Sequence, residues 1–141
     1  MKILIGLILS AVFLCLAGIH FYWGLGGKWG AEVAIPTKAD NQKVMNPKLF
    51  SCFVVAFGLL GFGLFVFVKS QLFSIELPNW LLNYGLWGLS VLFILRAIGE
   101  FKYIGFFKKI KATKFGQMDT KYYSPLCLVI GLLAISLQLL K

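Results

Sequence analysis

Four long apolar runs divide the chain, and most of its charged residues lie between them. We expect helices at residues 3–22, 47–68, 80–99 and 124–140. Twenty helical residues rise about 30 Å, which is roughly the thickness of the hydrocarbon core of a bilayer. The pattern therefore predicts an all-α fold, an integral membrane four-helix bundle, as a single domain over residues 1–141.

Proline and small polar residues mark where three of these helices should begin. Asn46–Pro47, Pro78–Asn79 and Ser124–Pro125 directly precede apolar runs. Proline suits the first helical position, and Asn or Ser before it caps the free backbone N–H groups. We therefore expect Ser124 to cap a short fourth helix.

Small residues predict where helices approach closely. Gly6 and Ser10 are four residues apart in the first run, and the second run contains Gly58, Gly61 and Gly63. Such residues let the backbones of neighbouring membrane helices come together. The same pattern permits a homo-oligomer.

The segment 101–118 alternates aromatic residues with lysines. This pattern is typical of a partly helical segment that lies in the membrane interface. We expect its rings to face lipid and its lysines to face the head groups.

Composition and charge agree with a membrane protein. Hydrophobic residues make up 60% of the chain and charged residues 13%, whereas soluble domains have about 25% charged residues. The net charge is +9, and its cations flank apolar runs. This placement favours anionic lipid head groups as partners over nucleic acid, although the lysines could serve topology alone.

The distribution of lysines predicts the orientation. Ten lysines lie in the loops after the first and third runs, and three lie on the opposite side. The positive-inside rule places both long loops in the cytoplasm and both termini outside the cell membrane.

Three sequence blocks resemble one known family. They are IHFYWGLGGKWG followed by AIPT, RAIGEFKYIGFFKKIKATKFGQMDT, and YYSPLCL. The chain is similar to the membrane-protein family catalogued as domain of unknown function 3995. The resemblance implies a four-helix integral membrane protein and brings no activity with it.

Polar residues within and beside these blocks should gather at one side of the membrane. The candidate ligand-binding residues are His20, Trp23, Trp29, Arg96, Glu100, Tyr103, Asp119, Tyr122, Tyr123 and Ser124. Ionisable groups in membrane spans are costly, and therefore they are functional candidates by default. Arg96 suits a phosphate or carboxylate, and Glu100 and His20 are candidates for proton transfer.

Structural roles for the same groups stay open. Arg96 and Glu100 are four residues apart and could pair with each other. His20 could bond a neighbouring carbonyl, and Asp119 could cap a turn or pair with Lys121. The cysteines have no metal-ligand or CxxC spacing, and we expect no metal and no cofactor.

These observations lead to one main functional hypothesis and two alternatives. The main hypothesis is a module that binds a lipid or another amphiphile at the cytoplasmic interface. The first alternative is a small membrane enzyme that uses Glu100 and His20. The second is a small oligomeric transporter or assembly partner.

Overall fold

The computed structural model describes residues 1–40, 42–44, 49–70 and 75–140. Four helices in these ranges are long and apolar enough to cross a membrane. They are α1 (Lys2–Gly24), α3 (Leu49–Lys69), α4 (Asn79–Ile98) and a continuous helix from Lys114 to Leu139. The all-α, multi-pass membrane architecture predicted from the sequence is confirmed.

The fourth helix is longer than predicted. It consists of α5 (Lys114–Met118), the π-helical turn η1 (Asp119–Tyr123) and α6 (Ser124–Leu139). Together these elements have 26 residues, about 39 Å. The prediction that Ser124 caps a free helix end is wrong, because the preceding residues are already helical.

The real start of this helix lies ten residues earlier. Thr113 is its N-cap and accepts a hydrogen bond from the backbone N–H of Gly116 at 3.0 Å. The predicted start of α4 after Pro78 is confirmed. The predicted start at Asn46–Pro47 lies outside the described residues.

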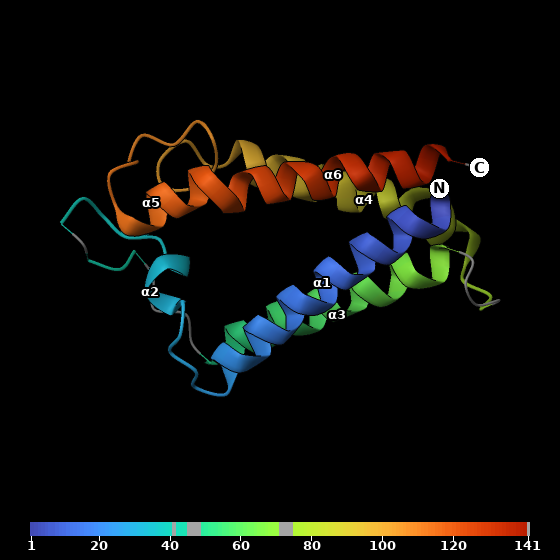
Figure 1. The fold of residues 1–141 in the computed structure, drawn as a ribbon, viewed down its shortest axis with the longest axis horizontal. Helices are drawn as coiled ribbons and strands as arrows, with labels where there is room; N and C mark the ends of the chain where they lie inside the picture. Colours follow the sequence, from blue (N-terminus) through green and yellow to red (C-terminus); the bar gives the residue numbers. More distant parts are fainter. Residues whose placement is uncertain (41, 45–48, 71–74, 141) are drawn as a thin grey trace.

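The helices pack as two pairs, α1 on α3 and α4 on α6 (Figure 1). Small residues hold the first pair together, as predicted. The Ser10 hydroxyl donates a hydrogen bond to the Gly63 carbonyl at 2.9 Å. A Cβ atom on Gly6 would lie 2.4 Å from the Cβ of Ser70, so only glycine fits there.

The other two glycines of α3 do not serve this contact. A Cβ atom on Gly58 or Gly61 would meet no neighbouring atom within 4 Å. The predicted close packing is therefore wrong for these two positions. Their side of α3 faces open space instead of a neighbouring helix.

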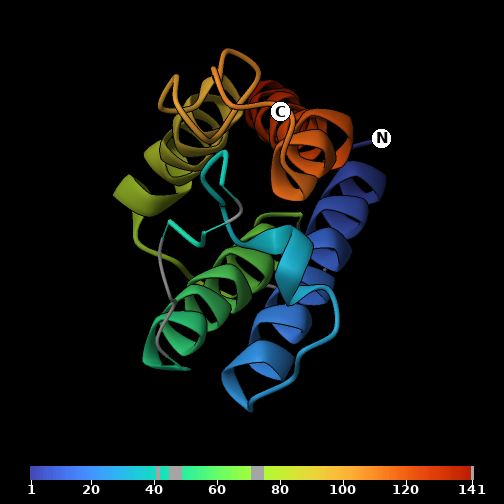
Figure 2. The same cartoon turned by 90° about the vertical axis from the view of Figure 1, so that its left-hand side faces the viewer.

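The two pairs meet near the chain termini and diverge toward α2 (Ala31–Ala34) and α5, as Figures 1 and 2 show. Three rings join the pairs: Phe13 of α1 lies 5.8 Å from Phe62 of α3 and 5.4 Å from Phe93 of α4, centroid to centroid. α2 packs against α5 at the divergent end. The long loops thus lie where the two pairs are farthest apart.

Candidate functional site

The loop between α4 and α5, residues 99–113, folds back on itself without forming a helix. Gly99 and Gly105 both have positive φ angles, +83° and +90°. A Cβ atom on Gly99 would lie 1.8 Å from the carbonyl oxygen of Ile104, and one on Gly105 would lie 2.2 Å from that of Ile98. The segment 101–118 is partly helical, as expected: residues 101–113 form no helix, and helix begins at Lys114.

This loop wraps around the carboxylate of Asp119, whose side chain is fully buried. The backbone N–H of Gly105 donates to Oδ2 at 2.8 Å, and the hydroxyl of Ser124 donates to the same oxygen at 3.1 Å. Arg96 donates to Oδ1 at 3.1 Å, and the Lys108 amine donates to Oδ2 at 2.9 Å. Four donors from α4, the loop and α6 therefore converge on one carboxylate. We call this group the carboxylate cluster; it consists of Asp119 with Arg96, Gly105, Lys108 and Ser124.

Lys108 is buried completely, contrary to the expectation that the lysines of this segment face the head groups. Its amine donates to the Gly105 carbonyl at 3.0 Å and to the Thr120 hydroxyl at 2.6 Å, besides Asp119. A buried ammonium is tolerated when it is paired and hydrogen-bonded. The carboxylate of Asp119 and these oxygens supply what water supplies to an exposed lysine.

Arg96 pairs with Asp119 and not with Glu100. Its guanidinium lies between the carboxylate cluster and the space between the helix pairs, and its Nη2 carries the ion pair at 3.1 Å. Its Nη1 is buried and has no hydrogen-bond partner among the described residues. Glu100 is exposed, and its carboxylate accepts from the backbone N–H of Tyr103 at 3.2 Å.

A cavity of about 400 Å³, here called the inner cavity, lies between the two helix pairs. All four long helices line it, with Leu16, His20, Val55, Gly58, Leu59, Phe62, Leu92, Phe93, Arg96, Tyr123, Leu126, Cys127 and Ile130. Most of these side chains are apolar. Arg96, His20 and Tyr123 are the residues that bring polar groups to its wall.

One ring nitrogen of His20 has no hydrogen-bond partner in the part of the chain that the structure describes. Its Nδ1 lies 2.8 Å from the Leu16 carbonyl oxygen, as the structural alternative expected. A carbonyl only accepts hydrogen bonds, so Nδ1 carries the proton and Nε2 is left as the free nitrogen. The ring packs edge-on against Trp23 at 5.1 Å, and the Trp23 indole donates to the Trp29 carbonyl at 2.8 Å.

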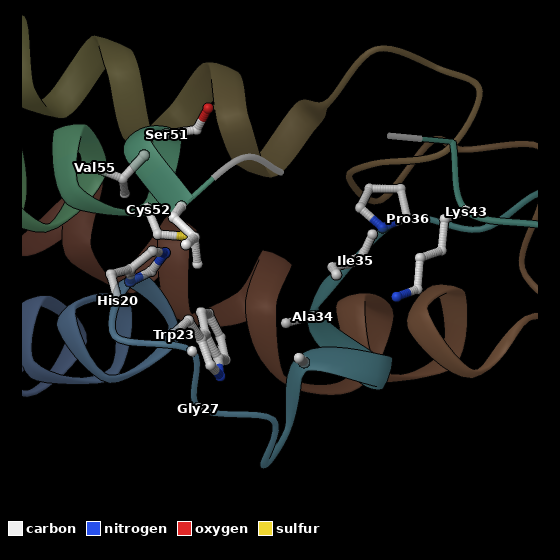
Figure 3. Close-up of a pocket in the computed structure, with 13 residues that line it drawn as sticks. His20, Trp23, Gly27, Ala34, Ile35, Pro36, Lys43, Ser51, Cys52 and Val55 are labelled. Carbon is white, nitrogen blue, oxygen red and sulfur yellow. The ribbon is translucent and has the colours of Figure 1, made fainter. Parts of the chain in front are cut away.

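A second cavity of about 450 Å³, here called the outer cavity, lies between the end of α1, the α1–α3 loop and the start of α3 (Figure 3). It is lined by His20, Trp23, Gly26, Gly27, Ala31, Ala34, Ile35, Pro36, Lys43, Leu49, Ser51, Cys52 and Val55. His20 and Val55 line both cavities. The two spaces therefore meet at these side chains.

The structure brings part of the predicted site together. His20, Arg96 and Tyr123 line the inner cavity, and Asp119 and Ser124 lie behind Arg96. The remaining candidates are Trp23, which lines only the outer cavity, and Trp29, Glu100, Tyr103 and Tyr122, which line neither. Among the described residues no group of three His, Cys, Asp or Glu side chains could hold a metal ion.

Sequence reasoning missed Lys108 and Gly105. The block RAIGEFKYIGFFKKIKATKFGQMDT contains both, and its second Gly was the available signal for a tight turn. Nothing in the spacing distinguishes Lys108 from the neighbouring lysines. Its burial follows from the fold of the loop.

Residues 13–134 match a family model described as "Protein of unknown function (DUF3995)". Both the carboxylate cluster and the lining of the inner cavity fall within this match. No curated protein and no solved structure matches the chain. Since the match spans 122 of 141 residues (13 through 134), the chain belongs to the family of proteins of unknown function catalogued as DUF3995.

Proposed function

We propose that this protein binds an anionic amphiphile, whose charged group meets Arg96 and whose chain occupies the inner cavity. The observation that carries the proposal is that Arg96 lines a mostly apolar cavity and that its buried Nη1 has no partner among the described residues. An unsatisfied buried donor costs about 1–3 kcal/mol. An anionic ligand would remove that cost.

The charge of the carboxylate cluster supports an anion. Asp119 carries one negative charge, and its ion-pair partners Arg96 and Lys108 carry two positive charges, which leaves +1. Glu100, four residues from Arg96, is directed to the backbone of Tyr103. An excess positive charge beside an apolar wall attracts a phosphate or carboxylate, to which guanidinium binds with charge-assisted hydrogen bonds.

The remaining lining suits a hydrocarbon chain. The volume of the inner cavity, about 400 Å³, is within the range of small-molecule sites, about 300–1,000 Å³. Val55, Gly58 and Leu92 line the cavity and are exposed on the membrane-facing surface of α3 and α4. A bilayer lipid would thus have direct access to the space between the helix pairs.

The location of the site agrees with the charge pattern of the loops. Arg96 and Tyr123 lie toward the ends of their helices that face the two long loops. With the orientation expected from the lysines, these ends face the cytoplasm, in the cell membrane. The partners are then anionic lipids of the cytoplasmic leaflet.

The proposal is tested by native mass spectrometry of the protein released from mild detergent. We expect a stoichiometric lipid adduct on the wild type that is lost in Arg96→Ala. Lys102→Ala is the matched control, because Lys102 is exposed and lies outside both cavities. We expect the Lys102→Ala variant to keep the lipid adduct.

A second variant separates ligand binding from folding. Arg96→Ala also removes one of the two ion pairs of Asp119, whereas Gly58→Leu leaves the carboxylate cluster intact and adds bulk to the wall of the inner cavity. We expect Gly58→Leu to fold and to lose the adduct. A wild type without an adduct, or an adduct that survives both substitutions, would contradict the proposal.

A further inference from the structure

The outer cavity has the properties of a second part of the same binding site. Its lining contains apolar and aromatic side chains together with Lys43 and Ser51, and no described residue of the lining is acidic. Figure 3 shows His20 and Cys52 at one end of the cavity and Lys43 at the other. A polar group without positive charge fits these surroundings.

His20 lines both cavities, and Arg96 lines the inner one. Its Nδ1–H is held by the Leu16 carbonyl, so its Nε2 is available to the contents of the cavities. An anionic group that contacts both Arg96 and His20 would lie where the two cavities adjoin. A substituent on one side of the anionic group would extend into the inner cavity. A substituent on its other side would extend into the outer cavity.

Protein forms one side of the outer cavity. The short helix α2 and the residues that follow it, up to Pro36, line this side, and α2 packs against α5. A head-group substituent in the cavity would contact this side of the chain. The protein could thus distinguish lipids by what lies beyond their phosphate.

This inference rests on the proposed function and deepens it. We propose that the outer cavity is a head-group subsite, and that the ligand is an anionic phosphodiester lipid. Its phosphate lies between Arg96 and His20, one acyl chain fills the inner cavity, and a polar, hydroxyl-bearing substituent fills the outer cavity. A phosphate monoester lipid, which lacks such a substituent, leaves the outer cavity empty.

The three native cysteines allow a direct test. Cys52 lines the outer cavity, Cys127 lines the inner cavity, and Cys15 is exposed on α1 and lines neither. Three variants that each retain one cysteine are labelled with a small uncharged maleimide in detergent. Labelling rates are compared without lipid, with phosphatidylglycerol, and with phosphatidic acid of the same acyl chains.

We expect phosphatidylglycerol to protect both Cys52 and Cys127, and phosphatidic acid to protect Cys127 alone. At a lipid concentration ten times Kd, the labelling rate of a protected cysteine should fall roughly tenfold. The rate of Cys15 should not change. Arg96→Ala should abolish protection at both cavity positions.

Other outcomes separate the subsite from the proposed function. Protection of Cys127 by both lipids with no protection of Cys52 would overturn the head-group subsite and leave amphiphile binding in place. Equal protection of Cys52 by both lipids would also overturn the subsite, because the substituent would not be what covers Cys52. If neither lipid protected either cysteine, amphiphile binding itself would lose its support.

Discussion

Asp119 shows how a single residue can organise a site. Its carboxylate receives hydrogen bonds from Arg96, Gly105, Lys108 and Ser124, which belong to three different parts of the chain. The sequence suggested a local partner, Lys121, which lies two residues away. The observed partners lie 23, 14, 11 and 5 residues away, and only a folded loop brings them together.

We expect Asp119→Asn to reduce stability strongly. The side chains of Asp119 and Lys108 are both fully buried, so the substitution leaves an unpaired ammonium in the interior. Breaking such a pair from one side costs about 3–5 kcal/mol. The measurement is the free energy of unfolding in detergent.

Glu100→Gln is the matched control for this substitution. Glu100 is exposed, and an amide oxygen can still accept the hydrogen bond from the Tyr103 N–H. We expect little change in stability. Equal losses in the two variants would show that the carboxylate of Asp119 has no special role.

At the scale of elements, two local departures from regular structure create the cluster. Gly99 and Gly105 let the chain turn back directly after α4, with their backbones in contact. The π-helical turn η1 then places Ser124 beside Asp119, and the N–H of Ser124 donates to the Asp119 carbonyl. Residues five apart do not share a face in a regular α-helix, so the π turn is required for this contact.

We expect Gly105→Ala to disturb the whole site. Its φ of +90° disfavours any other residue by about 1–3 kcal/mol, and its Cβ would collide with the Ile98 carbonyl. The loop must shift, and the 2.8 Å hydrogen bond from its N–H to Asp119 is lost. Both the thermal stability and the lipid adduct should decrease.

Gly88→Ala provides the comparison within α4. A Cβ there meets nothing within 4 Å, and alanine favours a helix over glycine by about 1 kcal/mol. This variant should be at least as stable as the wild type and should retain its adduct. If Gly105→Ala behaved in the same way, the turn would not position Asp119.

At the scale of the whole molecule, unequal packing creates the inner cavity. Each helix pair is tightly packed, whereas the smaller contact between the pairs includes α1 against α6 and the Phe13, Phe62 and Phe93 rings. Beyond these rings the pairs diverge, and the inner cavity occupies the space that follows. The polar ends of the helices therefore meet across an opening instead of a packed core.

The orientation of the molecule is open to a direct test. One of the ten loop lysines, Lys108, is neutralised by Asp119, and the remaining nine lysines against three still predict that the long loops lie in the cytoplasm. A phosphatase reporter fused to the C-terminus should be active outside the cytoplasm. The same reporter inserted after Asp40, an exposed loop residue, should be inactive. The reverse pattern would contradict the orientation and move the site to the outer leaflet.

The sequence by itself determined the class of the protein and the approximate extent of its helices. Long apolar runs permit few structures in a bilayer, because every backbone polar group must be satisfied within the span. The sequence also predicted the close helix contact at Gly6 and Ser10, since small residues four positions apart mark a close approach of neighbouring helices.

Only the tertiary structure decided the partners of the charged groups. Glu100 lies one helical turn from Arg96 in the sequence. In the folded chain Arg96 donates to Asp119 instead, and the Glu100 carboxylate accepts from the backbone N–H of Tyr103. Lys108 resembles its neighbouring lysines in sequence and is buried because the loop closes over it. Ion pairing depends on which groups share a dry interior, and helix rotation, loop conformation and the divergence of the two pairs set that interior.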